Sequence, residues 1–341
     1  MSTAIGGQNY LTLEAWAKRL DPDGKGVANI VEMLNQKNEE LMDMGWIEGN
    51  LPVGHRTTIR TGLPSTYWYL VNQGVPSSSS ETQQVDEMCG MLKTISIVDE
   101  ELAILNGNVS SLRLSEALAA TEALSQQMSQ TMWYGNSGVN PEQFLGFSPR
   151  YSTTSNAQNA QNIIKGGGST SVCASIWLVG WGEQTVHGIF PRGSKAGLER
   201  EDWGKRPIQV TSPNTGLASG MITAYQEDFK WKAGLSVKDW RYVVRICNID
   251  TTQLALESGS AADLFDLMQR ALNRPPSLKG GKPVFYMNRT VREFLGIQAR
   301  LDVQKGGQLK REIVDGWMQE DFQGVPVRIS DALLNTEAAV S

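Results

Sequence analysis

Histidine and long apolar runs are scarce in this 341-residue chain, and each scarcity excludes a class of protein. The two histidines, His55 and His187, have no neighbouring cysteine or acidic ligand set, so they favour ordinary surface or core roles over a metal site. The chain has no apolar run of about 18 residues and does not begin like a signal peptide. We therefore expect a protein that is made in the cytoplasm and has no membrane partner.

Cysteine and surplus positive charge are scarce as well. Cys89, Cys173 and Cys247 leave one thiol unpaired in any scheme and lack metal-type spacing, so we predict reduced, mostly buried thiols. The net charge is −5, and the densest basic stretch, Arg192–Arg206, also contains acidic residues. It predicts a solvated mixed-charge loop, and the overall balance excludes a dedicated nucleic-acid binder.

Motifs for catalysis are missing. The sequence contains no Gly-x-Ser-x-Gly elbow, and the glycine runs Gly166–Gly168 and Gly280–Lys282 lack the spacing of a phosphate loop. They are typical of turns. The sequence therefore predicts no catalytic residue, no cofactor and no metal, and a protein that is not an enzyme.

One acidic pattern leaves two interpretations open. Asp21, Asp23, Gly26 and Glu32 match the first, third, sixth and twelfth positions of a calcium-binding loop. Lys25 places a cation at the fifth position, where a ligand oxygen belongs. A plain connector between two helices is therefore favoured over a calcium site.

The first part of the chain offers too little apolar surface to fold alone. Helices are expected over Tyr10–Leu20 and Val27–Gly45, followed by a hairpin of His55–Thr61 and Thr66–Val71. Ile59 is the single large apolar residue of the first hairpin strand, and a two-stranded ribbon that polar is marginal in water. We expect this ribbon to rest on another subunit.

The remaining pattern alternates strands and helices. A long helix is expected from Ser110 or Ser111 to Gly135, about 24 residues or 36 Å, with an apolar stripe. The stripe residues are Leu114, Ala117, Leu118, Thr121, Leu124, Met128 and Met132. Other expected strands are Met91–Val98, the pair within Ser175–Ile189, Met221–Trp231 paired with Trp240–Ile249, Val284–Met287 and Val325–Ile329. Helices are expected over Ala255–Asn273 and Arg289–Gln298, and an aperiodic loop region over Arg192–Gly220.

Three local runs, in this order of elements, carry a resemblance to a known family. They are Pro141–Tyr151 after the long helix, Pro283–Leu295 as a strand followed by a helix, and Phe322–Leu333 as a closing strand. Together they resemble the major capsid proteins of tailed bacteriophages, podovirus-like members in particular. The resemblance implies an α+β, Hong Kong 97-type fold with an N-terminal arm, an extended β-hairpin loop, a long spine helix, and peripheral and axial domains.

The resemblance also implies a division of the chain. Its parts are an N-terminal helical arm (1–45), an extended hairpin loop (46–85), a peripheral domain with the spine helix (86–154), an axial domain (155–310) and a return to the peripheral domain (311–341). The axial part carries a possible β-rich insertion at 190–253.

The function implied is that of a virion protein. Copies of the chain would self-assemble into hexamers and pentamers of an icosahedral head enclosing double-stranded DNA, which they contact non-specifically. Scaffolding, portal and decoration proteins are further partners of such shells. Arg56, Arg60, Tyr67, Trp68 and Tyr69 of the hairpin would contact a neighbouring subunit, although Arg56 and Arg60 could equally be solvated charges that discourage edge aggregation.

Two further expectations complete this interpretation. Some family members join subunits through a hairpin lysine, but no lysine occurs between Lys37 and Lys93, so we predict a shell without that cross-link. An encapsulin-like nanocompartment shell is the alternative function, and gene neighbourhood would separate the two. The third and least favoured alternative is an enzyme whose site is assembled from scattered carboxylates.

Overall fold

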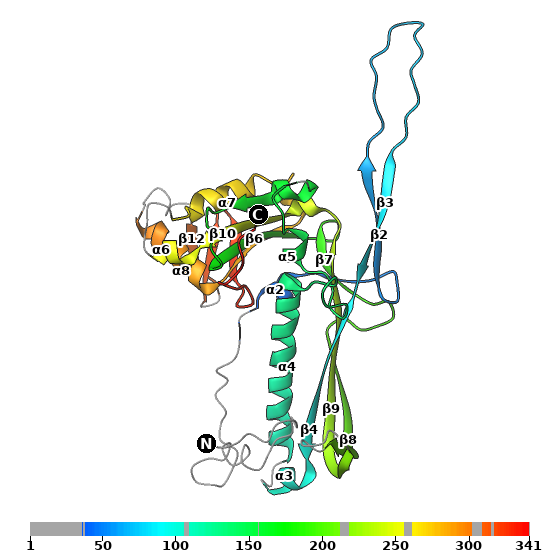
Figure 1. Cartoon of the computed structure of the whole chain (residues 1–341), viewed down its shortest axis with the longest axis vertical. Helices are drawn as coiled ribbons and strands as arrows, with labels where there is room; N and C mark the ends of the chain where they lie inside the picture. The colour runs from blue at the N-terminus through cyan, green and yellow to red at the C-terminus, as the bar shows by residue number, and fades with distance from the viewer. Residues whose placement is uncertain are drawn as a thin grey trace. The chain divides into compact units, whose positions relative to one another are not determined.

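The computed structural model describes residues 36, 38–105, 109–155, 157–211, 218–255, 261–301, 309–314 and 317–340. The chain is mixed α/β, and its residues group into two compact units (Figure 1). The described parts of the first, here the spine unit, are Met91–Met128 and Gly197–Trp231. The second, the large unit, consists of Gln36–Gly90, Ser129–Ala196 and Lys232–Ser341.

The expected N-terminal arm lies mostly outside the described residues, as do the helix Tyr10–Leu20 and the calcium-type pattern. Near the start of the described residues, Asn38 forms an isolated antiparallel β-bridge with Ser330. Helix α2 follows and covers only Glu40–Asp43. The expected helix Val27–Gly45 is therefore wrong at Asn38 and correct for its last turn.

A mixed sheet forms the centre of the large unit. Its path runs β12-β13-β14-β11-β6-β7, with β10 paired to β5 and β6, and β1 paired to β7. The strands are β1 (Trp46–Glu48), β5 (Ile163–Lys165), β6 (Cys173–Trp181), β7 (Val186–Phe190), β10 (Val243–Asp250), β11 (Lys282–Met287), β12 (Leu309–Val314), β13 (Trp317–Phe322) and β14 (Val325–Ile329). Every residue of β6 and β10 is buried, as expected for strands covered on both faces.

Short helices cover this sheet. They are α5 (Phe147–Arg150), α6 (Thr251–Ala255), α7 (Leu264–Leu272), α8 (Arg289–Leu301) and the 3₁₀ turns η1 (Gln158–Asn162), η2 (Trp240–Tyr242) and η3 (Leu278–Gly280). The expected helix Ala255–Asn273 begins later than predicted, because Asp263 caps α7 by accepting a hydrogen bond from the Asp266 N–H. Asn288 caps α8 in the same way, by accepting a hydrogen bond from the Val291 N–H.

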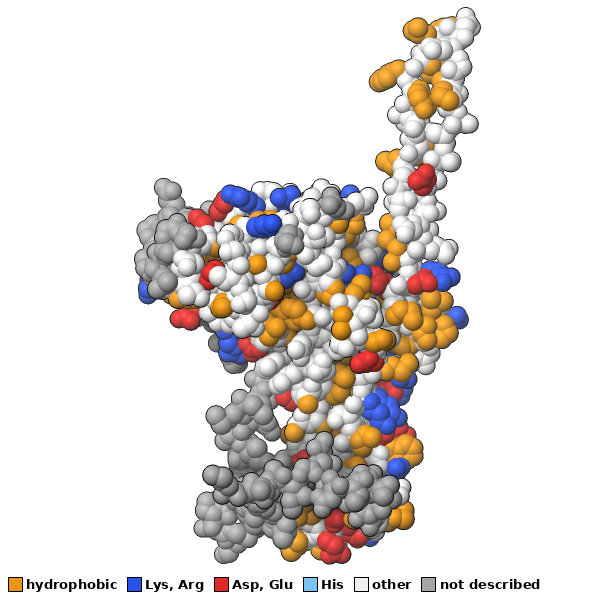
Figure 2. Space-filling model, viewed as in Figure 1, with side chains coloured by type: hydrophobic (Ala, Val, Ile, Leu, Met, Phe, Trp, Pro, Cys, Tyr) orange, Lys and Arg blue, Asp and Glu red, His pale blue; other side chains and the backbone are white. Residues whose placement is uncertain are grey.

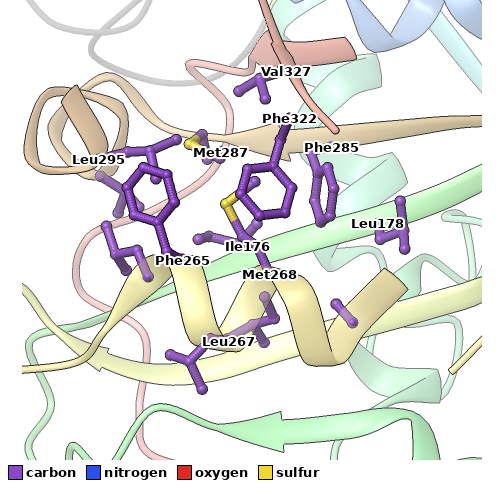
Figure 3. Close-up of a cluster of buried hydrophobic side chains, with 14 of the residues drawn as sticks. Ile176, Leu178, Phe265, Leu267, Met268, Phe285, Met287, Leu295, Phe322 and Val327 are labelled. Carbon is purple, nitrogen blue, oxygen red and sulfur yellow. The ribbon is translucent and has the colours of Figure 1, made fainter. Parts of the chain in front are cut away.

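The two faces of β6 bury different cores because successive side chains point to opposite sides of a strand. On one face, Ile176 and Leu178 join the cluster that contains Phe265 and Met268 of α7, Phe285 of β11 and Phe322 of β13 (Figure 3). On the other face lies a cluster of aromatic rings with centroids 5.3–6.4 Å apart. Its members are Trp133, Phe147, Tyr151, Trp177, Trp181 and Tyr286.

A buried ion pair fixes the C-terminal segment to the sheet. The Arg245 guanidinium of β10 donates to the Glu337 carboxylate at 2.8 Å, and the two side chains are 3% and 5% exposed. The Tyr134 hydroxyl donates to the same carboxylate at 2.5 Å, and Ser175 donates to it as well. Because each charge is buried with its partner and further donors, the pair holds residues distant in sequence in one arrangement.

The spine unit is built around one long helix. Helix α4 (Val109–Tyr134) has 26 residues and continues into the large unit; α3 (Glu100–Leu105) precedes it. Strands β4 (Gly90–Asp99) and β8 (Leu198–Thr211) flank β9 (Ala218–Val237), whose C-terminal residues also belong to the large unit. Helix α4 and strand β4 confirm the long helix and the strand Met91–Val98 that the sequence predicts.

The apolar stripe of α4 is narrower than predicted. Ala117 and Leu124 pack with Phe229 of β9, and Met128 is also buried. Leu114 and Leu118 were expected in this stripe but are 60% and 55% exposed. At about 100° per residue these two leucines lie to one side of the line through Ala117 and Leu124, beyond the part of the helix that the sheet covers.

The long loop expected over Arg192–Gly220 is wrong, because residues 198–211 form strand β8. Its charges pair across the sheet and onto α4: Glu201 with Lys230 at 2.7 Å, and Asp202 with Arg113 at 2.7 Å. A mixed-charge sequence favours a solvated loop. In the fold, however, these residues lie opposite partners of opposite charge on a neighbouring strand or on α4, which stabilises a strand instead. The expected pairing of Met221–Trp231 with Trp240–Ile249 is wrong too, since β9 pairs with β8 and β10 pairs with β6.

Candidate subunit-contact site

The hairpin forms a two-stranded sheet of its own within the large unit. Its strands are β2 (Gly54–Gly62) and β3 (Glu81–Met88), in antiparallel register with Thr57 opposite Val85. The expected second strand, Thr66–Val71, is wrong, because those residues lie in the connection between the strands. β-Branched and aromatic side chains favour strands only where a neighbour packs on them, and here the polar residues of β3 supply the matching register.

The connection, residues 63–80, has almost no cover from the described part of the chain; we call it the ribbon tip. Trp68 is fully exposed, Tyr67 is 50% exposed and Tyr69 is 68% exposed. Leu63, Leu70 and Val71 are also largely exposed, and Figure 2 shows these hydrophobic side chains along the distal hairpin. Several large apolar side chains exposed on one short connection mark it as a candidate interaction surface.

The two arginines predicted for subunit contact differ in their surroundings. Arg56 is bound in bidentate fashion by Asp86 on the opposite strand, at 2.6 Å for both contacts. The hydrogen bonds that Arg56 donates to Asp86 raise the pKa of Arg56 and lower the pKa of Asp86. Arg60 lies opposite Thr82 and has no ion-pair partner among the described residues.

Side-chain contacts fix the base of the ribbon to the rest of the large unit. Arg150, which follows the long helix, binds both oxygens of Glu87 at 2.7 and 2.6 Å, and Glu87 is buried. The Asn50 side chain both donates to the Arg56 carbonyl and accepts from the Arg56 N–H. A Cβ on Gly54 would lie 2.1 Å from the Glu87 carbonyl oxygen, so only glycine allows this approach of the two strands.

Sequence reasoning missed the base of the ribbon. Arg150 lies in the run Pro141–Tyr151 that supports the family resemblance, but no spacing rule connects it to Glu87, 63 positions earlier. Asp86 was missed as the partner of Arg56 because the hairpin register was assigned to the wrong second strand. The five predicted contact residues share one ribbon, with Arg56 and Arg60 on the strands and the three aromatic residues in the tip.

The described residues offer little chemistry for a metal or redox centre. They contain no group of three or more histidine, cysteine, aspartate or glutamate side chains that could hold a metal ion. The thiols of Cys89, Cys173 and Cys247 are unpaired, and the last two are buried as predicted. In the same part of the chain, no helix is long and apolar enough to span a bilayer.

Comparisons with known proteins agree on one kind of protein. The sequence model of the family "Major capsid protein GP7" matches residues 21–341. The chain is 28% identical to the solved structure of bacteriophage Epsilon15, with 99% of each chain covered and a TM-score of 0.73. No curated protein matches the chain.

Two more distant similarities support no conclusion about this chain, because both TM-scores are below 0.5. The bacteriophage JBD30 capsid is 10% identical, with 90% of this chain and 95% of that chain covered and a TM-score of 0.45. An encapsulin from Synechococcus elongatus PCC 7942 is 10% identical, with 66% and 94% covered and a TM-score of 0.41.

Proposed function

This chain belongs to the major capsid protein GP7 family and forms the head of a tailed phage, and we propose that its β2–β3 ribbon carries the contact between neighbouring subunits. It is a structural component of the virion and not an enzyme, and it acts as a homo-oligomeric shell. The observation that carries the proposal is the exposure of Tyr67, Trp68 and Tyr69 on a hairpin that its own chain leaves uncovered.

The chemistry of the ribbon tip suits a protein surface as its partner. Tyrosine and tryptophan are the residues that most often dominate the binding energy of interfaces, because they bury large area with few rotatable bonds. A two-stranded ribbon that stands alone in water is marginally stable. Covering Trp68 and its neighbours on another copy would therefore stabilise both the ribbon and the shell.

The ribbon also explains how a shell of rings could arise. A contact between the ribbon of one copy and a different surface of the next is heterologous, and heterologous contacts close into rings when the rotation between copies allows it. We infer that these rings are the hexamers and pentamers of an icosahedral head. Scaffolding, portal and decoration proteins are the further partners expected of such a head.

The domain boundaries that we propose are those expected from the sequence. We propose a helical arm (1–45), a hairpin loop (46–85), a peripheral domain with α4 (86–154), an axial domain (155–310) and a return segment (311–341). Within the possible insertion at 190–253, residues Gly197–Trp231 group with the long helix in the spine unit. This grouping supports a role for that β-hairpin in the peripheral part.

Arg60 is the stronger candidate of the two arginines for a contact across subunits. Arg56 already binds Asp86 through Nε and Nη2, so its charge is paired within the ribbon and only its remaining donors are left for a neighbour. Arg60 lacks an ion pair among the described residues and can meet an acidic group on another copy. Such a charge sets orientation more than affinity.

Contact with packaged DNA is proposed to be weak and independent of base sequence. The chain carries a net charge of −5, so it lacks the surplus of cations that would bind phosphate tightly. A head that must release its DNA is compatible with this balance. The family match supports a phage head, and no separate observation favours the encapsulin-like alternative.

The proposal is tested by a Trp68→Ala, Tyr69→Ala variant and a matched Ser77→Ala, Ser79→Ala control in the same connection. We expect the first variant to remain folded, by circular dichroism, and to form few or no shells by electron microscopy. The control should assemble like the wild type. Normal shells from the aromatic variant would contradict the proposal.

Subunit cross-linking is a separate matter. Because the ribbon contains no lysine, we propose that the mature shell is held together without a covalent bond at this position. Denaturing gel electrophoresis of mature particles should give a single band at the monomer mass. A ladder of covalent oligomers would show the opposite.

A further inference from the structure

The only two histidines of the chain meet at the base of the ribbon, although they are far apart in the sequence. His55 lies on β2 and His187 lies on β7. Their ring centroids are 6.0 Å apart, with the ring planes at 80° to one another. They therefore form a direct contact between the ribbon and a strand of the main sheet, and β2 and β7 touch at this place.

The surroundings of His187 suit an uncharged ring. The side chain is 1% exposed and sits opposite Ser236 in the β7–β9 pairing. Neither ring nitrogen makes a hydrogen bond of normal geometry with the described residues, although the Gly182 carbonyl lies near enough to favour a proton weakly. A buried charge without a partner is strongly disfavoured, so the site accepts the neutral imidazole.

Two charged groups lie near the pair, one just after β9 and one on β3. Lys238, just after β9, opposes protonation of both rings. Glu87 of β3 favours a proton on His55, but both of its oxygens are bound by Arg150. The second imidazole is itself a repelling neighbour once either ring is charged. Protonation therefore places like charges together at the point where the ribbon joins the sheet.

We propose that His55 and His187 form a proton-sensitive latch, which holds the base of the ribbon against β7 while both rings are neutral and releases it when either ring is protonated. The latch controls the attachment of the ribbon base. It does not depend on which surface receives the ribbon tip, so it stands apart from the proposed subunit contact.

The direction of the pH dependence follows from the proton balance. Burial lowers the pKa of His187 to about 4, with Lys238 and His55 acting in the same direction; burial also lowers the pKa of His55. A released, solvated imidazole titrates near its ordinary value of 6.5. The closed latch thus binds fewer protons than the open one. It is fully stable above pH 6.5 and weakens as the pH falls from 6.5 towards 4, by up to about tenfold per unit for each ring.

A metal site is the competing use of two imidazoles, and the surroundings disfavour it. Among the described residues no third side chain completes a ligand set, and the nearest carboxylate, Glu87, is held by Arg150. Lys238 would also repel a cation. A Zn²⁺-dependent rise in thermal stability at pH 7 that is lost in His187→Gln would overturn the latch in favour of a metal site.

Hydrogen–deuterium exchange of the full-length chain in assembled particles tests the latch. After correction for intrinsic rates, peptides covering β1, β2 and β7 should lose protection as the pH falls from 7.5 to 5.0. Peptides from β11 in the core should keep theirs. In His187→Gln only His55 can still take a proton, so the loss of protection at the ribbon base with falling pH should be smaller than in the wild type.

A second variant keeps the test decisive if His187→Gln does not fold. Lys238→Gln removes a charge that opposes protonation of the closed latch, so the closed and open forms differ less in proton binding and the loss of protection with falling pH should be smaller than in the wild type. An identical pH profile in the wild type and His187→Gln, or an unchanged profile in Lys238→Gln, would overturn the proposal.

Discussion

Strand β6 and the β2–β3 ribbon belong to the same unit but differ completely in burial. All nine residues of β6 are buried, between a core of aliphatic and phenylalanine side chains and a cluster of large rings. In the ribbon, β3 has a single buried residue, Glu87, and the ribbon tip is exposed throughout. The first region is stabilised by its own chain. The second exposes apolar side chains that the described part of the chain does not cover, and we propose that another copy covers them.

The ribbon itself repeats this contrast along its length. At its base, Gly54 and Glu87 are buried and Arg150 binds the Glu87 carboxylate. Towards the tip, burial ends and the pairing stops at Gly62 and Glu81. The subunit thus fixes where the ribbon begins, and no contact among the described residues fixes its far end in the same way.

The largest difference is expected between two aromatic residues. Phe285→Ala should lower the free energy of unfolding of the unassembled subunit by about 3–5 kcal/mol, because Phe285 is fully buried in the core. Trp68→Ala should change it by less than about 0.5 kcal/mol, because the ring is exposed. Urea denaturation of both variants measures this. A comparable loss in Trp68→Ala would show that the ribbon tip packs on its own subunit.

The next largest effect should come from the buried ion pair. Arg245→Met leaves the Glu337 carboxylate buried without its cation, and should cost about 3–5 kcal/mol in urea denaturation. Adding Glu337→Gln to the same variant removes the unpaired charge and should recover part of that loss. No recovery in the double variant would mean that Arg245 acts by packing on Trp177 and not through its charge.

A smaller effect is expected at the ribbon base. Glu87→Gln removes one charge from a largely buried bidentate pair with Arg150, and should weaken the attachment by about 1–3 kcal/mol. Hydrogen exchange should become faster in β2 and β3 near the base and stay unchanged in β11. Unchanged exchange at the base would show that Gly54 and Asn50 hold the ribbon without this ion pair.

The smallest effect is expected on the open face of the ribbon. Asp86→Asn breaks the contact with Arg56, but both groups are exposed to solvent and screened by salt. The denaturation midpoint of the unassembled subunit should therefore not change measurably. A clear shift that disappears at high salt would contradict this and make the pair a structural element of the ribbon.

The sequence predicted the long helix, the closing strand Val325–Ile329 and the C-terminal part of the helix Ala255–Asn273, because each has a strong local pattern. It failed for β8, whose charges are balanced by residues far away in the chain. It also exchanged the second hairpin strand with the ribbon tip, because local propensity does not reveal which residues pair.

The residues predicted to contact a neighbouring subunit show the same limit of prediction from local sequence. Exposure of Tyr67, Trp68 and Tyr69 follows from a ribbon too polar to form a core, and the aromatic run is visible in the sequence. The meeting of His55 with His187, and of Arg150 with Glu87, depends on tertiary placement that no spacing indicates. Local patterns therefore predict elements, whereas pairing between distant elements requires the folded chain.

Hydrogen exchange of residues 63–80, compared between unassembled subunits and finished shells, tests the central claim most directly. If another copy covers the ribbon tip, exchange should be fast in the free subunit and at least about tenfold slower in the shell. Equally fast exchange in both states would show that the tip stays uncovered and that the shell is joined through other surfaces.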